Sequence, residues 1–300
     1  MTDLPHLRLL EPAPGILAWY DGRVPGYRWQ SGPNWVDDGA LSVGIASYAI
    51  HGGGHALVYD THVSLAHAAR IRADLEDRGV TRFTVVLSHW HLDHVAGTAT
   101  FADSPVIASH RTATHLATRR KAIEAGTSSG PPPIRPLILP TETFDGTMVL
   151  SVGGREVWLL TADIHSDDAT VLWLPDDRIL LAGDTLEDTV TYVGEPEGFA
   201  AHLRDLDRLA ALGPARILPN HGDPGVIAAG GYGAGLIGAT QAYIRWLMAL
   251  GADPGRAGTP LREVIADDLA AGRVVWFEGY EDVHRENVAV TLRHYGHADA

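Results

Sequence analysis

The sequence predicts an α/β fold: an αββα sandwich of two mixed β-sheets with helices on the outer faces, plus a helical C-terminal extension. The predicted elements run strands, helix, strand, helix, and then strands, helix, strand, helices. Two halves of this kind indicate two sheets that pack face to face with helices outside. From about residue 233 the apolar residues recur at helical spacing, which predicts the extension.

The first half begins with two strands joined by a glycine-rich turn. Residues 41–50 and 56–60 are apolar, and His51, three glycines and His55 form the turn between them. The other elements predicted in this half are a helix at 64–79, a strand at 83–87, a strand at 105–109 and a helix at 112–125.

The second half follows a loop rich in Gly, Ser and Pro at residues 126–137. The predicted strands lie at 147–152, 156–161, 170–174, 178–182 and 216–218, and the predicted helices at 199–211, 236–250, 260–271 and 281–295. We predict a single domain over 1–300, with an N-terminal extension to about 40, a core at 41–230 and the helical extension at 231–300. The loop is not taken as a boundary because candidate ligands lie on both sides of it.

Composition excludes several kinds of protein. With no cysteine among 300 residues, a disulfide framework and a thiolate metal site are both impossible, so any metal must be held by His, Asp or Glu. The formal charge of -14 argues against nucleic-acid and anionic-membrane partners, because such partners are bound through clustered Lys and Arg. The sequence has no apolar run of membrane-spanning length and no signal peptide pattern, so we expect a cytoplasmic protein.

Four candidate metal ligands lie within six residues directly after the strand at 83–87. They are His89, His91, Asp93 and His94. In extended backbone His89 and His91 point to the same side, and Asp93 continues the alternation. Without a metal, three crowded imidazoles would be hard to satisfy with hydrogen bonds. Residue types, spacing and position after a strand therefore favour a metal site over a histidine-rich surface loop.

This run resembles the HxHxDH signature of the metallo-β-lactamase superfamily. The resemblance extends over about residues 41–225, and it places further ligands at His165, Asp184 and His221. Taken alone, either histidine is more often a surface residue, and Asp184 alone could cap a helix or occupy a turn. Asp60 corresponds to an aspartate that orients a ligand from outside the metal centre.

The resemblance implies a centre with two divalent ions. Their ligands would be His89, His91 and His165 for one ion, Asp93, His94 and His221 for the other, and Asp184 between them. Nitrogen and oxygen donors suit Zn(II), our expectation, and also Fe(II), Mn(II) and Co(II). Two such ions can lower the pKa of a shared water to about 7. We therefore expect a metal-bridging hydroxide as nucleophile, with Asp93 either passing its proton to the leaving group or serving as a ligand only.

We expect the substrate to be a small molecule with an ester, lactone or related acyl bond. The resemblance leaves β-lactam or thioester hydrolysis, mononuclear iron persulfide dioxygenation and metal-free binding as alternatives. Glu187 stands where a lysine binds the drug carboxylate in one β-lactamase subclass, and an acid there would repel that group. Tyr192 is a candidate donor to an oxyanion, as a tyrosine is in some lactonases.

Aromatic residues gather in the N-terminal segment and in the tail. They wall a pocket or pack in the core, and a pocket of this kind suits a neutral substrate with an apolar or aromatic part. The sequence leaves a homo-oligomer open. These aromatic residues are Trp19, Tyr20, Tyr27, Trp29, Trp35, Tyr243, Trp246, Trp276, Phe277 and Tyr280.

Overall fold

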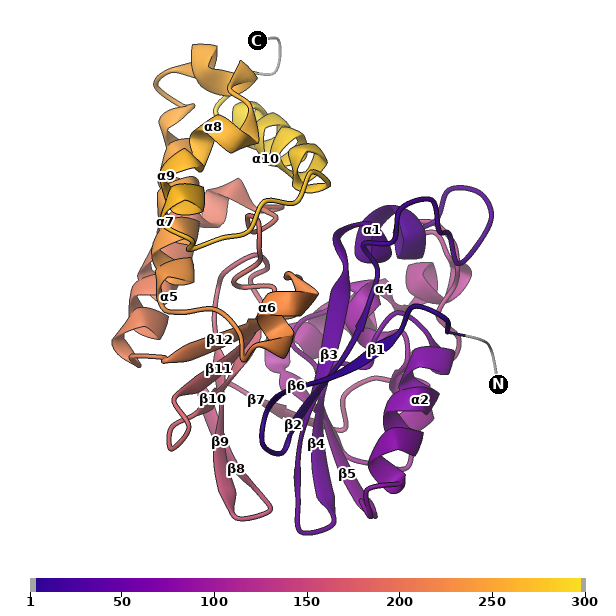
Figure 1. Ribbon diagram of the computed structural model, residues 1–300. Coiled ribbons are helices and arrows are strands. Elements are labelled where there is room, and N and C mark those ends of the chain that lie inside the picture. The colour runs from indigo at the N-terminus through magenta and orange to yellow at the C-terminus, as the bar shows by residue number, and fades with distance from the viewer. Residues whose placement is uncertain (1–3, 298–300) are drawn as a thin grey trace.

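The computed structural model describes residues 4–297 and contains two mixed sheets that pack face to face (Figure 1). The larger sheet has the strand order β1-β2-β3-β4-β5-β6-β7, antiparallel from β1 to β4 and parallel from β4 to β7. Its strands are β1 (Arg8–Ala13), β2 (Ile16–Asp21), β3 (Ile45–Gly52), β4 (His55–Tyr59), β5 (Arg82–Val86), β6 (Val106–Ser109) and β7 (Glu142–Phe144).

The smaller sheet has the order β12-β11-β10-β9-β8, in which only the pair β11 and β12 is parallel. Its strands are β8 (Thr147–Val152), β9 (Arg155–Thr161), β10 (Thr170–Leu174), β11 (Ile179–Gly183) and β12 (Arg216–Pro219). A parallel pair needs a long crossover, and α5 (Phe199–Ala211) lies in the connection from β11 to β12.

Helices cover both outer faces, which confirms the αββα architecture. In Figure 1, α2 (Leu65–Glu76) and α4 (His110–Ala125) lie outside the larger sheet, and α5 and α7 (Gly235–Ala249) lie outside the smaller one. The remaining helical segments are η1 (Val36–Ala40), α1 (Leu41–Val43), α3 (Leu92–Val95), η2 (Thr98–Phe101), η3 (Pro196–Gly198), α6 (Pro224–Ala228), η4 (Pro254–Gly258), α8 (Leu261–Val264), α9 (Ala266–Ala270) and α10 (Tyr280–His294).

Strand β3 shows how the larger sheet is buried on both faces. Alternate residues of a strand point to opposite faces. Ala46, Tyr48 and Ile50 belong to the hydrophobic cluster shared with the smaller sheet, whereas Ala49 belongs to the cluster that contains Ala68 of α2. A strand covered on both sides is apolar along its length, which is why β3 reads as a continuous apolar run.

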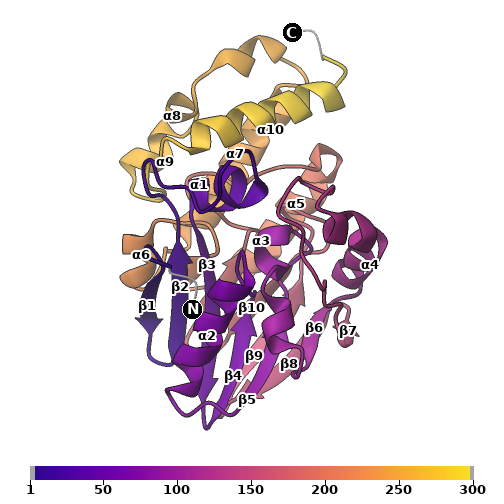
Figure 2. The same cartoon turned by 90° about the vertical axis from the view of Figure 1, so that its right-hand side faces the viewer.

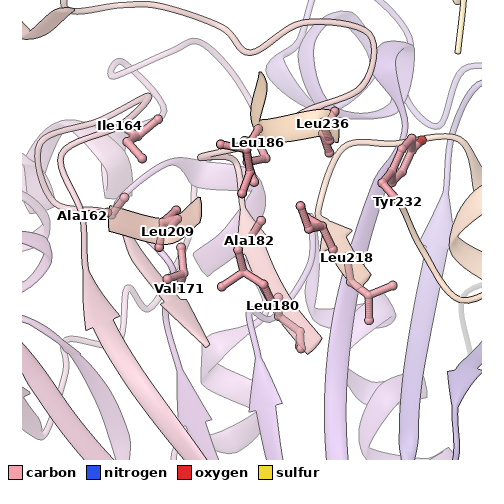
Figure 3. Packing of buried hydrophobic residues seen from close by; sticks show 14 of the residues in the cluster. Ala162, Ile164, Val171, Leu180, Ala182, Leu186, Leu209, Leu218, Tyr232 and Leu236 are labelled. Atoms are coloured by element: carbon pink, nitrogen blue, oxygen red, sulfur yellow. The ribbon is translucent and has the colours of Figure 1, made fainter. Parts of the chain in front are cut away.

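The cluster shared by the two sheets extends into the C-terminal helices. Figure 3 shows part of it, where Val171, Leu180 and Leu218 of the smaller sheet belong to one cluster with Leu209 of α5 and Leu236 of α7. The helical extension is therefore joined to the sandwich by apolar packing. No helix in the described part of the chain is both long and apolar enough to span a membrane.

The start of β3 differs from the sequence prediction. Residues 41–50 were predicted as one strand, but Leu41–Val43 form α1 and the strand begins at Ile45. Gly44 separates the two with a φ of 75°, and a Cβ at this position would lie 1.9 Å from the Tyr20 hydroxyl oxygen. The backbone therefore turns at Gly44 in a conformation that glycine adopts readily.

Other differences are local. β1, β2 and β7 were not predicted as strands, although β1 and β2 extend the larger sheet from β3. The helix predicted at 260–271 is interrupted at Ile265, so that α8 and α9 replace it. Figure 2 shows that α10 lies across the end of the sandwich, above α1.

Candidate metal centre

The predicted ligands come from four connections at one end of the two sheets. His89, His91, Asp93 and His94 follow β5, and the structure corrects the expectation that Asp93 lies in extended backbone. His91 is the residue before α3, so Asp93 and His94 lie in a helical turn. The three remaining candidates are His165 between β9 and β10, Asp184 directly after β11, and His221 after β12.

These seven side chains form two groups of ligand atoms that lie within 4.8 Å of one another in each group. The first group contains His89, His91, His165 and Asp184, and the second contains Asp93, His94 and His221. Within the first, His91 Nδ1 lies 2.8 Å from His89 Nε2 and 3.0 Å from His165 Nε2. Within the second, Asp93 Oδ2 lies 3.4 Å from His94 Nε2 and 3.3 Å from His221 Nε2.

Asp184 Oδ2 lies between the two groups. It is 3.6 Å from Nε2 of both His89 and His165, 3.1 Å from His94 Nε2 and 3.3 Å from His221 Nε2. One carboxylate oxygen therefore faces four imidazole nitrogens from both groups. This is the arrangement expected of a carboxylate that bridges two cations.

The outer nitrogens of the imidazoles are held by acceptors outside the centre. His94 Nδ1 lies 2.9 Å from Asp60 Oδ2, and His221 Nδ1 lies 2.6 Å from the Gly44 carbonyl oxygen. His89 Nδ1 lies 2.9 Å from the Ser88 hydroxyl oxygen. Donation from Nδ1 to a carboxylate or carbonyl leaves the Nε2 lone pair free to face a metal. The structure thus places Asp60 where the sequence predicted it.

Burial and neighbouring charges set the protonation of the centre. Burial, followed by repulsion from His165, lowers the pKa of His91 to about 3, and burial with His94 holds the pKa of His89 well below its usual value. Both rings are therefore neutral at pH 7. Burial acts to raise the pKa of the Asp184 carboxyl, but His94 and His221 outweigh it and hold that pKa well below its usual value. Burial acts to lower the pKa of His94 and of His221, but Asp184 outweighs it and holds both pKa values well above the usual value. Without a cation these two rings therefore keep a second proton, which metal binding would displace.

The donor set fits two divalent ions. Asp184 Oδ1 is buried and has no hydrogen-bond partner among the described residues. A buried oxygen without a partner is costly unless another group satisfies it. Imidazole nitrogens and carboxylate oxygens, with no sulfur in the chain's ligand set, suit zinc and also iron or manganese.

A cavity of about 560 Å³ opens onto the centre and is lined by His91, Asp93, His165, Asp184 and His221. Its outer wall combines apolar and charged side chains from the N-terminal segment, the residues after β5, the connection after β11 and α10. These include Trp35, Val43, Trp90, Leu92, Tyr192, Val283, Asp38, Asp282 and Glu286.

Tyr192 lines this cavity beside the first group of ligands. Its ring centre lies 5.8 Å from that of His165, and its carbonyl oxygen lies 3.1 Å from His165 Nδ1. Burial, with the charges of Glu286 and Glu187, raises the pKa of its hydroxyl. The hydroxyl therefore keeps its proton at neutral pH and can act as a donor.

Glu187 is held by hydrogen bonds that the sequence did not predict. Its carboxylate is buried and accepts hydrogen bonds from the Tyr192 backbone amide at 2.8 Å and from the Tyr280 hydroxyl at 3.1 Å. Glu187 also lines the cavity, so these hydrogen bonds hold its carboxylate in place at the cavity wall. The sequence left open whether Tyr280 walls the pocket or packs in the core, and its contact with Glu187 was not predicted because nothing local in the sequence relates residues so far apart.

The aromatic residues divide between the two roles considered. Trp35 lines the cavity, whereas Trp19, Tyr20, Tyr243 and Tyr280 are fully buried among core residues. Most of the large aromatic side chains therefore build the fold, and the cavity takes its aromatic surface from Trp35, Trp90 and Tyr192.

Solved structures with the same architecture support this view of the fold. A DIM-1 metallo-β-lactamase exposed to ceftazidime has a TM-score of 0.61 at 20% identity, covering 81% of this chain and 99% of that chain. A metallo-β-lactamase family protein from Thermus thermophilus has a TM-score of 0.59 at 20% identity and covers 95% of both chains. A metallo-β-lactamase from Pontibacter korlensis has a TM-score of 0.59 at 17% identity, with 80% and 99% covered. At these identities the likeness shows the fold alone.

Sequence comparison adds one curated relative and a family. The chain is 32% identical over 96 residues to a linear primary-alkylsulfatase of Pseudomonas sp. (strain ATCC 19151), which is 29% of this chain and only 18% of that protein. The family model described as the metallo-beta-lactamase superfamily matches residues 43–221, which contain all seven clustered side chains. Because this match covers more than half of the chain, the protein belongs to the metallo-β-lactamase superfamily.

Proposed function

We propose that the protein is a dinuclear metal-dependent hydrolase of an ester, lactone or related acyl bond. The observation that carries the proposal is the position of Asp184 Oδ2, within 3.6 Å of imidazole nitrogens from both groups of ligand atoms. We assign His89, His91 and His165 to one ion, Asp93, His94 and His221 to the other, and Asp184 to both. Zinc is the proposed metal, with iron or manganese as alternatives.

The residues around the cavity suit hydrolysis. When bound, the ions would supply a water of lowered pKa and would polarise the scissile carbonyl. Asp93 lies at the cavity wall, half-buried, where its carboxylate can accept a proton and return it to the leaving group. The Tyr192 hydroxyl, which keeps its proton, is proposed to donate a hydrogen bond to the oxygen that gains charge.

The cavity wall favours a neutral substrate with an apolar or aromatic part. Among the described lining residues Arg28 is the only lysine or arginine, and its guanidinium lies 2.6 Å from Asp38 Oδ1. Glu286, in contrast, has no ion-pair partner among the described residues. A substrate with a carboxylate far from the metals would therefore meet repulsion without a compensating cation.

Sulfate ester hydrolysis is the second candidate, because the curated relative is a linear primary-alkylsulfatase. The aligned region is short, and one fold can host several chemistries. The residues that line the cavity therefore determine which substrate is bound. β-Lactam hydrolysis is grouped with sulfate ester hydrolysis, because both substrates are anions and the acidic cavity wall would repel them.

A substrate panel with metal-reconstituted protein tests the proposal. The panel contains an aryl ester, a lactone, a thioester, a β-lactam, a phosphodiester and an alkyl sulfate, and oxygen uptake is recorded with a persulfide. We expect turnover of the ester or lactone, and its loss in His91→Ala together with metal. Turnover of alkyl sulfate alone would favour the second candidate. Oxygen consumption with one iron per chain would overturn the assignment to hydrolases.

A further inference from the structure

His165 is held differently from the other imidazoles of the metal centre. Its backbone φ is 67°, a region that residues other than glycine rarely adopt. Such a conformation persists only where surrounding groups enforce it. Its Nδ1 lies 3.1 Å from the Tyr192 carbonyl oxygen and 3.3 Å from Glu187 Oε1, so two acceptors face one nitrogen. Nδ1 therefore carries the proton, and Nε2 faces the centre.

Both acceptors belong to residues 187–193, which we call the support loop. Within it, Glu187 Oε1 also accepts from the Tyr192 backbone amide at 2.8 Å and from the Thr191 hydroxyl at 3.3 Å. The Glu187 residue is 3% exposed. Its orientation is thus set by several hydrogen bonds and not by solvent.

The support loop is in turn held by α10. The Tyr280 hydroxyl donates to Glu187 Oε2 at 3.1 Å, and Tyr280 is fully buried. Two helical turns later Asn287, also fully buried, accepts from the Val193 amide at 2.7 Å and donates to the Thr191 carbonyl at 2.9 Å. One face of one helix therefore holds both ends of the loop.

The segment before α10 adds contacts to the middle of the support loop. The Thr189 hydroxyl donates to the Val275 carbonyl at 2.8 Å and accepts from the Phe277 amide at 3.2 Å. Asp188 Oδ1 accepts from the Val275 amide at 2.8 Å. Residues 275–287 thus contact the loop along most of its length.

The partners of the other imidazoles come from a different part of the chain. His94 is oriented by Asp60, His221 by the Gly44 carbonyl and His89 by Ser88, all of which lie within residues 43–221. Tyr280 and Asn287 lie beyond this family match. Of these four imidazoles, His165 is the one whose ring nitrogen faces groups that contact the C-terminal extension; His221 meets the support loop only through its carbonyl oxygen, which accepts from the Asp188 amide at 3.1 Å.

We propose that Tyr280 and Asn287, acting through Glu187 and the Tyr192 carbonyl, position His165 and so set the affinity of the metal site that contains it. They are positioning residues, because neither lines the metal centre itself. The inference rests on the proposed dinuclear centre. It assigns a selective effect: the site of His89, His91 and His165 depends on α10, and the site of Asp93, His94 and His221 does not.

The test is a competition titration of the full-length metal-free protein with zinc and a chromogenic chelator, which yields an affinity for each site. In Tyr280→Phe, Glu187 Oε2 loses its hydrogen-bond donor, and the carboxylate is then held at Oε1 only. Loss of a group that orients a ligand lowers metal affinity by about 10-fold to 100-fold. We expect this loss at one site only. The Co(II) absorption spectrum of the half-loaded variant should match that of His165→Ala.

Two further variants separate positioning from folding. Glu187→Gln preserves the size of the side chain and an acceptor for the Tyr192 amide, but it removes the charge facing His165; we expect the same selective loss. Thr240→Val is the control, because it also removes a buried hydroxyl from the extension. That hydroxyl donates to the Leu236 carbonyl oxygen at 3.0 Å within α7, away from α10 and the support loop. We expect both affinities to be retained in this control.

The outcomes distinguish this inference from the proposed function. If the wild-type protein binds no metal, both are overturned. If it binds two ions and the folded variants retain both affinities, or lose both equally, only the role of α10 is overturned. Should Tyr280→Phe fail to fold by circular dichroism, Glu187→Gln decides by the same criterion.

Discussion

Replacing Asp60 with asparagine is expected to weaken the metal centre and the fold together. The carboxylate is fully buried and accepts three hydrogen bonds. Oδ1 accepts from the Ser88 backbone amide at 2.7 Å, and Oδ2 faces His94 Nδ1 at 2.9 Å and Asn220 Nδ2 at 2.6 Å. All three partners are donors, so the site is built for a group that only accepts.

An asparagine side chain fits the space but not the hydrogen bonds. In one orientation its amide group faces the Ser88 N–H; in the other it faces His94 and Asn220. At least one buried donor therefore loses its acceptor, which costs about 1–3 kcal/mol of stability. A weaker hold on His94 should lower metal affinity by about 10-fold to 100-fold, or about 1.4–2.7 kcal/mol. The backbone φ of 64° is one that asparagine tolerates, so the effect is not one of strain.

The assay pairs urea unfolding of the metal-free protein with zinc titration of the same sample. Asp74→Asn is the matched control, because Asp74 is a buried aspartate of α2 that accepts from Trp19 Nε1 at 2.8 Å, away from the metal centre. We expect the control to keep its metal affinity. If Asp60→Asn bound zinc as tightly as the wild type, the role given to Asp60 would be refuted.

Three further predictions concern stability. Burial lowers the pKa of His202 to about 4, so between about pH 6.5 and pH 4 this residue makes stability fall with falling pH, by up to about 3 kcal/mol, because the unfolded chain binds more protons. His202→Leu should reduce the slope of stability against pH by this amount in urea titrations at several pH values, and an unaltered slope would contradict it. A Cβ at Gly97 would lie 2.1 Å from the Thr61 carbonyl oxygen, so Gly97→Ala should lower the free energy of unfolding by about 1–3 kcal/mol or more, measured by thermal unfolding. A wild-type Tm would show that the segment after α3 can shift to accommodate the methyl group at little cost. Removal of metal by a chelator should lower Tm, because an ion present at about 1,000 times its Kd contributes about 4 kcal/mol to the folded state alone; an unchanged Tm after verified removal would count against metal binding by the folded state.

The sequence predicted the parts of the centre that are encoded locally. His89, His91, Asp93 and His94 lie within six residues after a strand, and the strand ends before Asp184 and His221 are short apolar runs. Because strand ends meet at one end of a sandwich, local patterns suffice to bring such residues together. Their service as ligands remains a prediction.

The missing parts depend on contacts between residues far apart in the chain. Glu187 and Tyr280 form a hydrogen bond although they are 93 residues apart in the sequence, and no periodicity or motif relates them. Sequence reasoning therefore treated Glu187 only as an acid that would repel a substrate carboxylate, whereas the fold keeps it at the cavity wall and also holds it by a hydrogen bond from α10. Similarly, β1 and β2 were missed because their strand character depends on pairing with β3.

Anomalous diffraction at the zinc edge, from crystals of the metal-reconstituted protein, tests the central claim most directly. The account predicts two peaks on either side of the Asp184 carboxylate, about 3.5–4 Å apart, one near His89, His91 and His165 and the other near His94 and His221. A single peak, or none at this end of the sandwich, would contradict it.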